Sequence, residues 1–272
     1  MTFEIDGPLV LVGAGKMGGA LLSGWLAKGL TPDQVIVREP SASPEIAALV
    51  AKGLSLNATV AEIAARKPAL VLIAVKPQAM ADVLPEWKLL VQPGTVFLSI
   101  AAGTGLARLE ELLGADVHAI RAMPNTPASV GRGMTVACAN RHVTPAQKAL
   151  ADQLLAAVGE VGWVENEALI DAVTAISGSG PAYVFHLVEC LAAAGEALGL
   201  EPELAMKLAR ETVSGSGEML HQFDESASVL RANVTSPGGT TAAALDVLMG
   251  ELAPLMRRAA LAARDRAREL GK

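Results

Sequence analysis

The stretch Leu9–Leu22, LVLVGAGKMGGALL, combines a short apolar run, a glycine-rich turn and the start of an amphipathic helix. Its glycines, Gly13, Gly15 and Gly18, have the spacing G-x-G-x-x-G, which in this context is typical of dinucleotide-binding domains. Gly13 permits a tight turn, Gly15 lets the backbone approach a pyrophosphate, and Gly18 lets the helix lie close to the strand. The helix N-terminus then presents free N–H groups to the phosphates. A chance glycine-rich turn is the alternative, and the flanking strand and helix favour the nucleotide interpretation.

Apolar runs recur along the first 165 residues, and helical patterns separate them. The runs are Val35–Val37, Ala69–Val75, Thr95–Ala101 and His118–Met123. Such continuous runs are typical of strands buried on both faces. Their alternation with helices predicts right-handed crossovers and a doubly wound, mostly parallel sheet of the Rossmann type. Thr135–Ala139 and Val161–Val164 are expected to add edge strands, with a helix beginning at Thr144-Pro145 between them.

No strand pattern is visible after Ala168. We therefore predict two domains, a dinucleotide-binding domain over residues 1–165 and an all-helical domain over residues 166–272. Pro181 and Pro202 are expected to begin long helices, and Pro254 to break or kink the last one. The helical domain carries more apolar residues than a part of this size easily buries alone, which favours dimerisation through it. An alanine-rich bundle that buries them within one chain is the alternative.

Composition narrows the class of protein. Hydrophobic residues make up 51% of the 272 residues and charged residues 18%, which permits a substantial core and excludes global disorder. The net charge is −6, and no long block of like charge indicates a nucleic-acid or anionic-lipid partner. The N-terminus lacks the pattern of a signal peptide, and the uninterrupted apolar runs are shorter than the ~18–20 residues that span a bilayer. We expect a soluble cytoplasmic protein without a membrane partner.

The cysteines and histidines suggest no further site. Cys138 and Cys190 lie in apolar segments without C-x-x-C spacing, so we interpret both as small core residues in a reducing compartment. The four histidines are scattered without metal-ligand spacing, and we expect no metal.

Three loops besides the glycine turn leave the carboxyl ends of the predicted strands, where ligands of such sheets bind. They are Val75-Lys76-Pro77, Ala101-Ala102-Gly103 and Met123–Pro127. Asn125 in the third loop can exchange hydrogen bonds with an amide such as a nicotinamide carboxamide. Each loop alone could be an ordinary turn between a strand and a helix. The three together at one sheet edge favour a binding site.

Two segments of the helical part could hold a carboxylate on backbone N–H groups at a helix start, namely Ser177–Pro181 and Ser236–Thr241. Ordinary helix capping explains either alone equally well. We find no Ser/His/Asp or Cys/His arrangement, and the predicted helix Pro181–Leu198 contains no lysine. Alcohol oxidation usually needs a general base. Reduction of a protonated C=N bond needs mainly positioning, because that bond already accepts hydride well.

Five motifs together resemble the pyrroline-5-carboxylate reductase family across essentially the whole chain. They are GAGKMG at Gly13, AVKP at Ala74, MPNTP at Met123, SGSGPAY at Ser177 and the signature-like segment Leu230–Leu248. The resemblance implies reduction of 1-pyrroline-5-carboxylate to L-proline by NAD(P)H. It also implies a Rossmann domain followed by a helical domain that interlocks with a second subunit, giving a homodimer or a higher oligomer of dimers.

The resemblance assigns residues to roles. It implies that the loop before the last helix binds the substrate carboxylate through backbone N–H groups, and that Thr241 approaches the ring nitrogen as the catalytic side chain. The other substrate-binding residues expected are Ser177, Gly238, Gly239 and Thr240. Together with the sheet-edge loops, the expected cofactor-binding residues are Gly13, Ala14, Gly15, Lys16, Met17, Gly18, Arg38, Glu39, Ala74, Val75, Lys76, Pro77, Ala101, Ala102 and Asn125.

One departure concerns the cofactor. The family usually has small or hydroxylated residues after the second strand, whereas this chain has Arg38-Glu39. Glu39 could bind a free ribose 2′-OH and repel a phosphate, while Arg38 could attract one. The family implies NADPH, and NADH use stays open. A β-hydroxyacid dehydrogenase and a non-catalytic nucleotide-binding regulator are the alternative functions. The missing helix lysine argues against the first, and the Ser236–Thr241 loop argues against the second.

Overall fold

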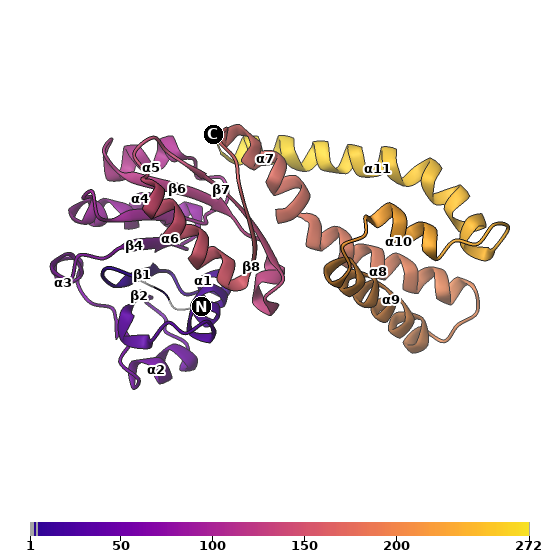
Figure 1. Ribbon diagram of the computed structural model, residues 1–272, viewed down its shortest axis with the longest axis horizontal. Helices are drawn as coiled ribbons and strands as arrows, with labels where there is room; N and C mark the ends of the chain where they lie inside the picture. The colour runs from indigo at the N-terminus through magenta and orange to yellow at the C-terminus, as the bar shows by residue number, and fades with distance from the viewer. Residues whose placement is uncertain (1–2, 4, 272) are drawn as a thin grey trace. The chain divides into compact units, whose positions relative to one another are not determined.

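The computed structural model describes residue 3 and residues 5–271 (Figure 1). The N-terminal stretch without a signal-peptide pattern includes residues 1, 2 and 4, which lie outside the described residues, as does residue 272. The chain divides into two compact units. The first comprises residues 1–178 and 264–272, and the second comprises residues 179–263.

An eight-stranded sheet forms the first unit, with the strand order β3-β2-β1-β4-β5-β6-β7-β8. The strands are β1 (Leu9–Val12), β2 (Val35–Arg38), β3 (Ser55–Leu56), β4 (Leu70–Ile73), β5 (Val96–Ser99), β6 (His118–Met123), β7 (Gly133–Ala139) and β8 (Gly159–Trp163). Only the β6–β7 pair is antiparallel among the pairings of the described strands, so the predicted mostly parallel sheet is confirmed.

Two details of the sheet differ from the prediction. β7 is not an edge strand, because β6 and β8 flank it, and β8 alone forms that edge. β3 was not expected, since its two half-buried residues form no apolar run. It pairs with β2 and carries the chain to Asn57, which has a φ of 56°.

Short helices connect the strands of the first unit. The α-helices are α1 (Lys16–Ala27), α2 (Pro44–Val50), α3 (Val60–Ala65), α4 (Met80–Val83), α5 (Leu106–Leu113), α6 (Pro145–Leu155) and α7 (Ile170–Val173). Single 3₁₀ segments are η1 (Pro32–Gln34), η2 (Pro77–Ala79), η3 (Leu84–Leu90), η4 (Thr126–Val130), η5 (Ala156–Val158) and η6 (Glu167–Leu169). Thr59 and Thr144 each precede their helix with a capping box.

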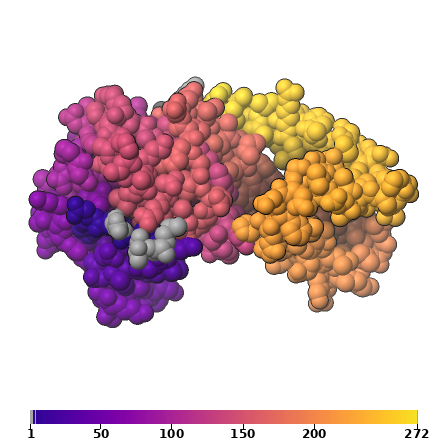
Figure 2. All heavy atoms as spheres, in the orientation of Figure 1, coloured from indigo at the N-terminus to yellow at the C-terminus, as the bar shows by residue number. Residues whose placement is uncertain are grey.

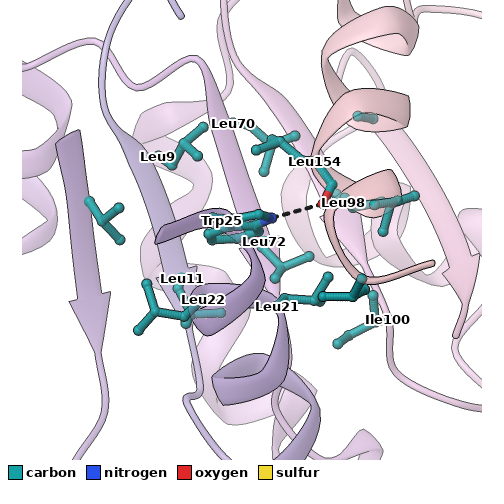
Figure 3. Packing of buried hydrophobic residues seen from close by; sticks show 14 of the residues in the cluster. Leu9, Leu11, Leu21, Leu22, Trp25, Leu70, Leu72, Leu98, Ile100 and Leu154 are labelled. Carbon is teal, nitrogen blue, oxygen red and sulfur yellow. Dashed lines mark hydrogen bonds between the residues drawn. The ribbon is translucent and has the colours of Figure 1, made fainter. Parts of the chain in front are cut away.

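Strand residues bury alternate side chains on the two faces of the sheet. Leu9 and Leu11 of β1 belong to a core with α1 and α6, whereas Val10 and Val12 belong to a core with α3, η3 and α5. Figure 3 shows the first core around Trp25, whose indole N–H donates to the carbonyl of Leu154 at 2.8 Å. This bond satisfies the one polar group of a large buried side chain. Helices on both faces confirm the doubly wound architecture.

The segment Ser177–Pro181, expected at a helix start, begins within a π-helical turn, η7 (Thr174–Gly178), between α7 and α8 (Gly180–Ala197). The backbone therefore stays helical through most of the glycine- and serine-rich stretch. A π turn adds one residue to a helical turn and is frequent at functional sites.

The second unit is helical throughout its described residues. It contains α8, α9 (Pro202–Gln222), α10 (Ala227–Asn233) and most of α11 (Thr240–Leu270). Gly195 of α8 lets that helix approach α9, since a Cβ there would lie 3.1 Å from Ala205 Cβ. Pro254 was expected to break or kink the last helix; α11 runs through this residue without a break, and the kink stays a prediction.

Many large apolar side chains of this unit are exposed in the single chain. Phe185 is 64% exposed, Val247 62% and Met249 59%. Figure 2 draws the atoms of these helices in orange to yellow. Cys190, expected in the core, is exposed on α8, whereas Cys138 is buried as predicted. The apolar surroundings of Cys190 in the sequence face outward in one chain.

One helical stretch among the described residues, Glu167–Ala197, is long and apolar enough to cross a membrane, with a mean hydropathy of 1.2 over 18 residues. The sequence expectation concerned uninterrupted apolar runs, and this stretch is not one of them. Polar residues interrupt the run, but the average over the window remains apolar. Length and composition alone do not distinguish a membrane span from a helix that another subunit covers.

Candidate active site

A pocket of about 580 Å³ lies beyond the carboxyl ends of β1, β2 and β4. The chain winds outward from β1 in both directions, through β2 on one side and β4 on the other, which makes this edge the topological switch point. Seven of the expected cofactor-binding residues line the pocket: Gly13, Gly15, Arg38, Glu39, Ala74, Val75 and Lys76.

The three glycines of the turn have different surroundings. Gly13 has a φ of 92°, and a Cβ there would lie 2.9 Å from the carbonyl oxygen of Ala74. A Cβ on Gly18 would lie 2.2 Å from the carbonyl oxygen of Gly13, so α1 could not stay this close to β1. Gly15 has open space where its Cβ would stand, and it lines the pocket. Gly13 and Gly18 therefore allow close packing within the protein, whereas Gly15 leaves space for a ligand.

Glu39 is fixed at the mouth of the turn. Its Oε2 accepts the N–H of Ala14 at 2.8 Å, and its Oε1 accepts the N–H of Ser41 at 3.0 Å. Asn57 accepts the Glu39 N–H and donates to the Glu39 carbonyl, at 2.9 and 3.0 Å. The carboxylate is thus held against the glycine turn by the backbone on both sides of it.

Arg38 directs its guanidinium to the other side of the pocket. Nη2 lies 3.2 Å from Oε1 of Glu86, and Nη1 donates to the carbonyl of Ala58 at 3.2 Å. The Cζ atom lies 6.0 Å from the centre of the Trp87 ring. Lys76 adds a second cation to the lining, so the charged side chains of the pocket are two cations and two carboxylates.

The pocket fits a dinucleotide. The open space beside Gly15, at the N-cap of α1, can take a phosphate group against backbone N–H donors. Glu39 offers carboxylate oxygens to ribose hydroxyls, and apolar Val75, Ala79 and Val83 offer a surface for a base. Lys16 and Met17 form the first turn of α1, beside Gly15.

Pro77, Ala101 and Ala102 are among the expected cofactor residues that do not line this pocket. Pro77 and Ala102 line a smaller pocket of about 190 Å³ within the first unit, next to Arg121 and Asp171. Ala101 is 6% exposed and donates its N–H to Ser99 Oγ at 3.3 Å. Their part in cofactor binding stays a prediction.

Asn125 holds protein groups with its whole amide. Its Nδ2 donates to both the carbonyl and the hydroxyl oxygen of Ser177, each at 3.2 Å, and its Oδ1 accepts the N–H of Met134 at 2.9 Å. The structure thereby ties the end of β6 to the π turn that contains Ser177. Binding of a carboxamide by Asn125 stays a prediction: Oδ1 keeps a second lone pair that can accept an N–H, whereas a new bond donated by Nδ2 requires one of its present bonds to open.

The four expected residues before and at the start of α11 belong to the second unit. Gly238 has a φ of 71°, and the N–H of Gly239 donates to the carbonyl of Ser236 at 3.0 Å. Thr240 is exposed and Thr241 half-buried, at the first two positions of the helix. Their roles toward a substrate stay predictions, and a role for the Gly239 N–H requires it to leave the Ser236 carbonyl.

The sequence interpretation missed Asn57, Glu86 and Trp87 in the pocket lining. Asn57 carries one usable signal, because asparagine tolerates the left-handed backbone that ends a short edge strand. Glu86 and Trp87 sit in a 3₁₀ segment without any motif. Their place beside Arg38 depends on how the chain after β4 folds back.

Two family models match parts of the chain. The family described as pyrroline-5-carboxylate reductase dimerisation matches residues 167–270, which include the apolar stretch Glu167–Ala197. The family described as NADP oxidoreductase, coenzyme F420-dependent, matches residues 8–103, which include the lining of the larger pocket.

Individual proteins show the same similarity over nearly the full length. A pyrroline-5-carboxylate reductase of Pseudomonas aeruginosa is 39% identical over 266 residues, which cover 97% of both chains. The structure of a pyrroline-5-carboxylate reductase from Coxiella burnetii has a TM-score of 0.91 at 36% identity, covering 98% of this chain and 99% of that one. The Plasmodium falciparum pyrroline carboxylate reductase, solved with NADP bound, has a TM-score of 0.81 at 30% identity, with coverages of 98% and 99%.

Proposed function

The chain belongs to the pyrroline-5-carboxylate reductase family, and we propose that it reduces 1-pyrroline-5-carboxylate to L-proline with NADPH, the last step of proline biosynthesis. One observation carries the cofactor part of this proposal. The pocket at the switch point of the sheet gathers the glycine turn, Arg38-Glu39 and the loop after β4, and Gly15 leaves open space beside the start of α1.

NADP bound to the Plasmodium relative supports the choice of cofactor. The bound cofactor supplies the hydride that adds to the imine carbon. The residues of this chain hold and orient: Gly15 and the first turn of α1 receive the pyrophosphate, and Glu39 receives a ribose hydroxyl. No strong general base is needed, since the protonated imine accepts hydride directly and its electron pair returns to the ring nitrogen.

The loop before α11 is the proposed substrate cradle. Backbone N–H groups at the start of a long helix favour a carboxylate, and the Thr241 hydroxyl stands on the same turn. In 1-pyrroline-5-carboxylate the ring nitrogen is two bonds from the carboxylate carbon. A carboxylate held by this loop would therefore place the nitrogen within reach of the Thr241 hydroxyl. Ser177, in the π turn, is a further proposed substrate contact, and Asn125 donates to its hydroxyl oxygen.

The assembly is part of the proposal. Residues 167–270 match a dimerisation family. The large apolar side chains that this segment exposes in the single chain would be buried against a second subunit. We expect a homodimer, with a higher oligomer of dimers as a further step. Burial in such a dimer also accounts for the apolar stretch Glu167–Ala197 without a membrane, consistent with a cytoplasmic enzyme.

The direct test is a parallel assay of NADPH and NADH oxidation with 1-pyrroline-5-carboxylate. We expect nucleotide oxidation with an equal yield of L-proline. The control is a panel of β-hydroxyacids with NAD⁺ and NADP⁺, where we expect no turnover. Turnover of a hydroxyacid without reduction of the pyrroline would favour the dehydrogenase alternative, and nucleotide binding without any turnover would favour the regulator.

A further inference from the structure

The charged groups around Arg38 carry an inference about cofactor choice that rests on the proposed dinucleotide binding. Arg38, Glu39, Glu86 and Trp87 line the same pocket as Gly15 of the glycine turn. In domains of this topology the residues after the second strand face the ribose 2′ position. NADH and NADPH differ only there, by a phosphate that carries a charge of about −1.5 to −2.

Glu39 cannot move away from that position without breaking the glycine turn's own contacts. Its two carboxylate oxygens accept the N–H groups of Ala14 and Ser41, and Asn57 bonds both backbone groups of the residue. A carboxylate retains acceptor sites after two such bonds, so it can still accept a ribose hydroxyl. A 2′-phosphate would meet a fixed negative charge.

Arg38 is the group that could offset this repulsion, and it is already engaged. Its side chain is 28% exposed, pairs with Glu86, donates to the Ala58 carbonyl and lies over Trp87. A guanidinium has five N–H donors, so three remain for a phosphate. The charge of Glu86, however, competes with the phosphate for the same cation.

We propose that Glu86 is a cofactor-specificity residue, which draws Arg38 away from the 2′ position so that this enzyme binds NADH with an affinity within about tenfold of that for NADPH. Glu39 contributes by accepting the 2′-OH of NADH. Removal of the Glu86 charge frees Arg38 for the phosphate and shifts the preference toward NADPH, without any change in the residues that touch the rest of the cofactor.

The test compares the dissociation constants of both nucleotides by calorimetry, with adenosine 2′,5′-bisphosphate and AMP as probes that lack nicotinamide. Glu86→Gln keeps the shape of the side chain and removes its charge. We expect it to tighten NADPH and the bisphosphate by roughly three- to tenfold, where tenfold is about 1.4 kcal/mol, and to leave NADH and AMP within a factor of two. Glu111→Gln is the matched control, because it removes the charge that pairs with Arg108 on α5. It should leave the affinities for both nucleotides and both probes unchanged.

A second variant identifies the cation. In the Glu86→Gln background, Arg38→Met should cancel the selective gain for NADPH and leave NADH nearly unchanged, whereas Lys76→Met should act on both nucleotides alike. Thermal unfolding of each variant verifies that it is folded, as expected for the half-exposed Glu86.

The inference is overturned if the selective gain in Glu86→Gln stays below threefold, if wild-type affinities differ more than tenfold, or if Lys76→Met and not Arg38→Met loses NADPH selectively. Binding of both nucleotides with any of these results would leave the proposed function standing. If the wild-type protein binds neither nucleotide, the proposed function and the inference both fail.

Discussion

Gly15 and Gly18 stand three residues apart in the glycine turn, yet their substitution should have opposite consequences. A Cβ on Gly15 meets no atom within 4 Å, so Gly15→Val should leave the stability unchanged. It should abolish binding of NADPH, because the new side chain occupies the space of the pyrophosphate. Calorimetric titration checks the affinity. Unchanged affinity would show that the phosphates lie elsewhere.

Gly18→Val forms the second half of this comparison. Its Cβ would lie 2.2 Å from the Gly13 carbonyl, so either α1 moves or the turn opens. We expect a loss of about 1–3 kcal/mol in the free energy of unfolding, measured by urea denaturation. Gly19→Ala is the matched control on the same helix. Its Cβ would make an ordinary contact at 3.5 Å with the Ala14 carbonyl, and the lower flexibility of alanine should stabilise α1 slightly.

Thr241 is the residue on which the chemistry depends most directly. Thr241→Ala should lower kcat/KM by about 10–10³-fold, or about 1.4–4 kcal/mol, because the protonated imine needs little further activation. NADPH affinity should stay within twofold, since the glycine turn lies in the other unit. Steady-state kinetics of Thr241→Ala and Thr240→Ala decide the assignment. Loss of activity in the second variant alone would move the role to Thr240, and full activity in both would leave the loop only its backbone donors.

The thiol of Cys138 should stay unreactive across the neutral and mildly alkaline range. Burial, with a smaller contribution from the Glu167 carboxylate, raises the pKa of this thiol above its usual value of 9.0. A raised pKa leaves less of the reactive thiolate at any pH. In a Cys190→Ser background, labelling by Ellman's reagent should be slow at every pH from 7 to 9, although its rate rises with pH as the small thiolate fraction grows. The urea-unfolded chain should react faster at each pH, and equal rates for the native and the unfolded chain would contradict the burial.

At the scale of elements, the strands were predictable where both faces are covered. Leu9–Val12 and Leu70–Ile73 are continuous apolar runs because one face packs on α1 and the other on α3 and η3. β3 was not predictable, because this two-residue edge strand is defined by its pairing with β2 and not by a hydrophobic pattern. The neighbours of β7 were likewise fixed by tertiary pairing, which residue periodicity does not encode.

The candidate site likewise has a part that the sequence predicts and a part that only the fold determines. Its glycine turn and the loop after β4 follow from local motifs at strand ends. The Arg38–Glu86 contact joins residues 48 positions apart, and no local signal brings them together. The engagement of the Asn125 amide with Ser177 and Met134 depends equally on how β6, β7 and the π turn meet. A motif predicts which groups are present, and the fold decides which of them are already in use.

The buried side-chain amide of Gln147 joins α6 to β6 and to the turn before β5. Gln147 lies in the first turn of α6, is 8% exposed, and its Oε1 accepts the Thr144 N–H at 3.0 Å. The same oxygen lies 2.7 Å from His118 Nδ1 of β6, and Nε2 donates to the Pro93 carbonyl at 3.0 Å. Gln147→Leu leaves these partners without a bond, so we expect a loss of about 2 kcal/mol or more, by urea denaturation.

Ala149→Leu serves as the control for this change. Residue 149 is exposed on the same helix, and leucine is a good helix former, so the free energy of unfolding should change little. If both variants lose the same stability, the effect belongs to the added leucine and not to the lost amide bonds.

At the scale of the whole molecule, assembly should depend on the apolar side chains of the helical unit. Phe185 on α8 is 64% exposed in the single chain. Phe185→Glu should convert the dimer to monomer at micromolar concentration in sedimentation equilibrium, because a carboxylate would be buried in an interface of more than about 2,000 Å². Leu89→Glu, at a side chain 63% exposed in the first unit, should leave the assembly unchanged. An active Phe185→Glu dimer would place the interface elsewhere.

The far end of α11 belongs to the first unit, with Arg268 near Asp171 and a Gly103 Cβ position 3.1 Å from the Leu270 carbonyl. Residues 264–271 are made only after the whole second unit, and they complete the part of the molecule made first. The Rossmann unit can form its strands during synthesis, but the end of α11 reaches it later. Domains normally fold in the order of their synthesis. Here the nascent Rossmann unit keeps an unfinished edge while the helical unit is being made.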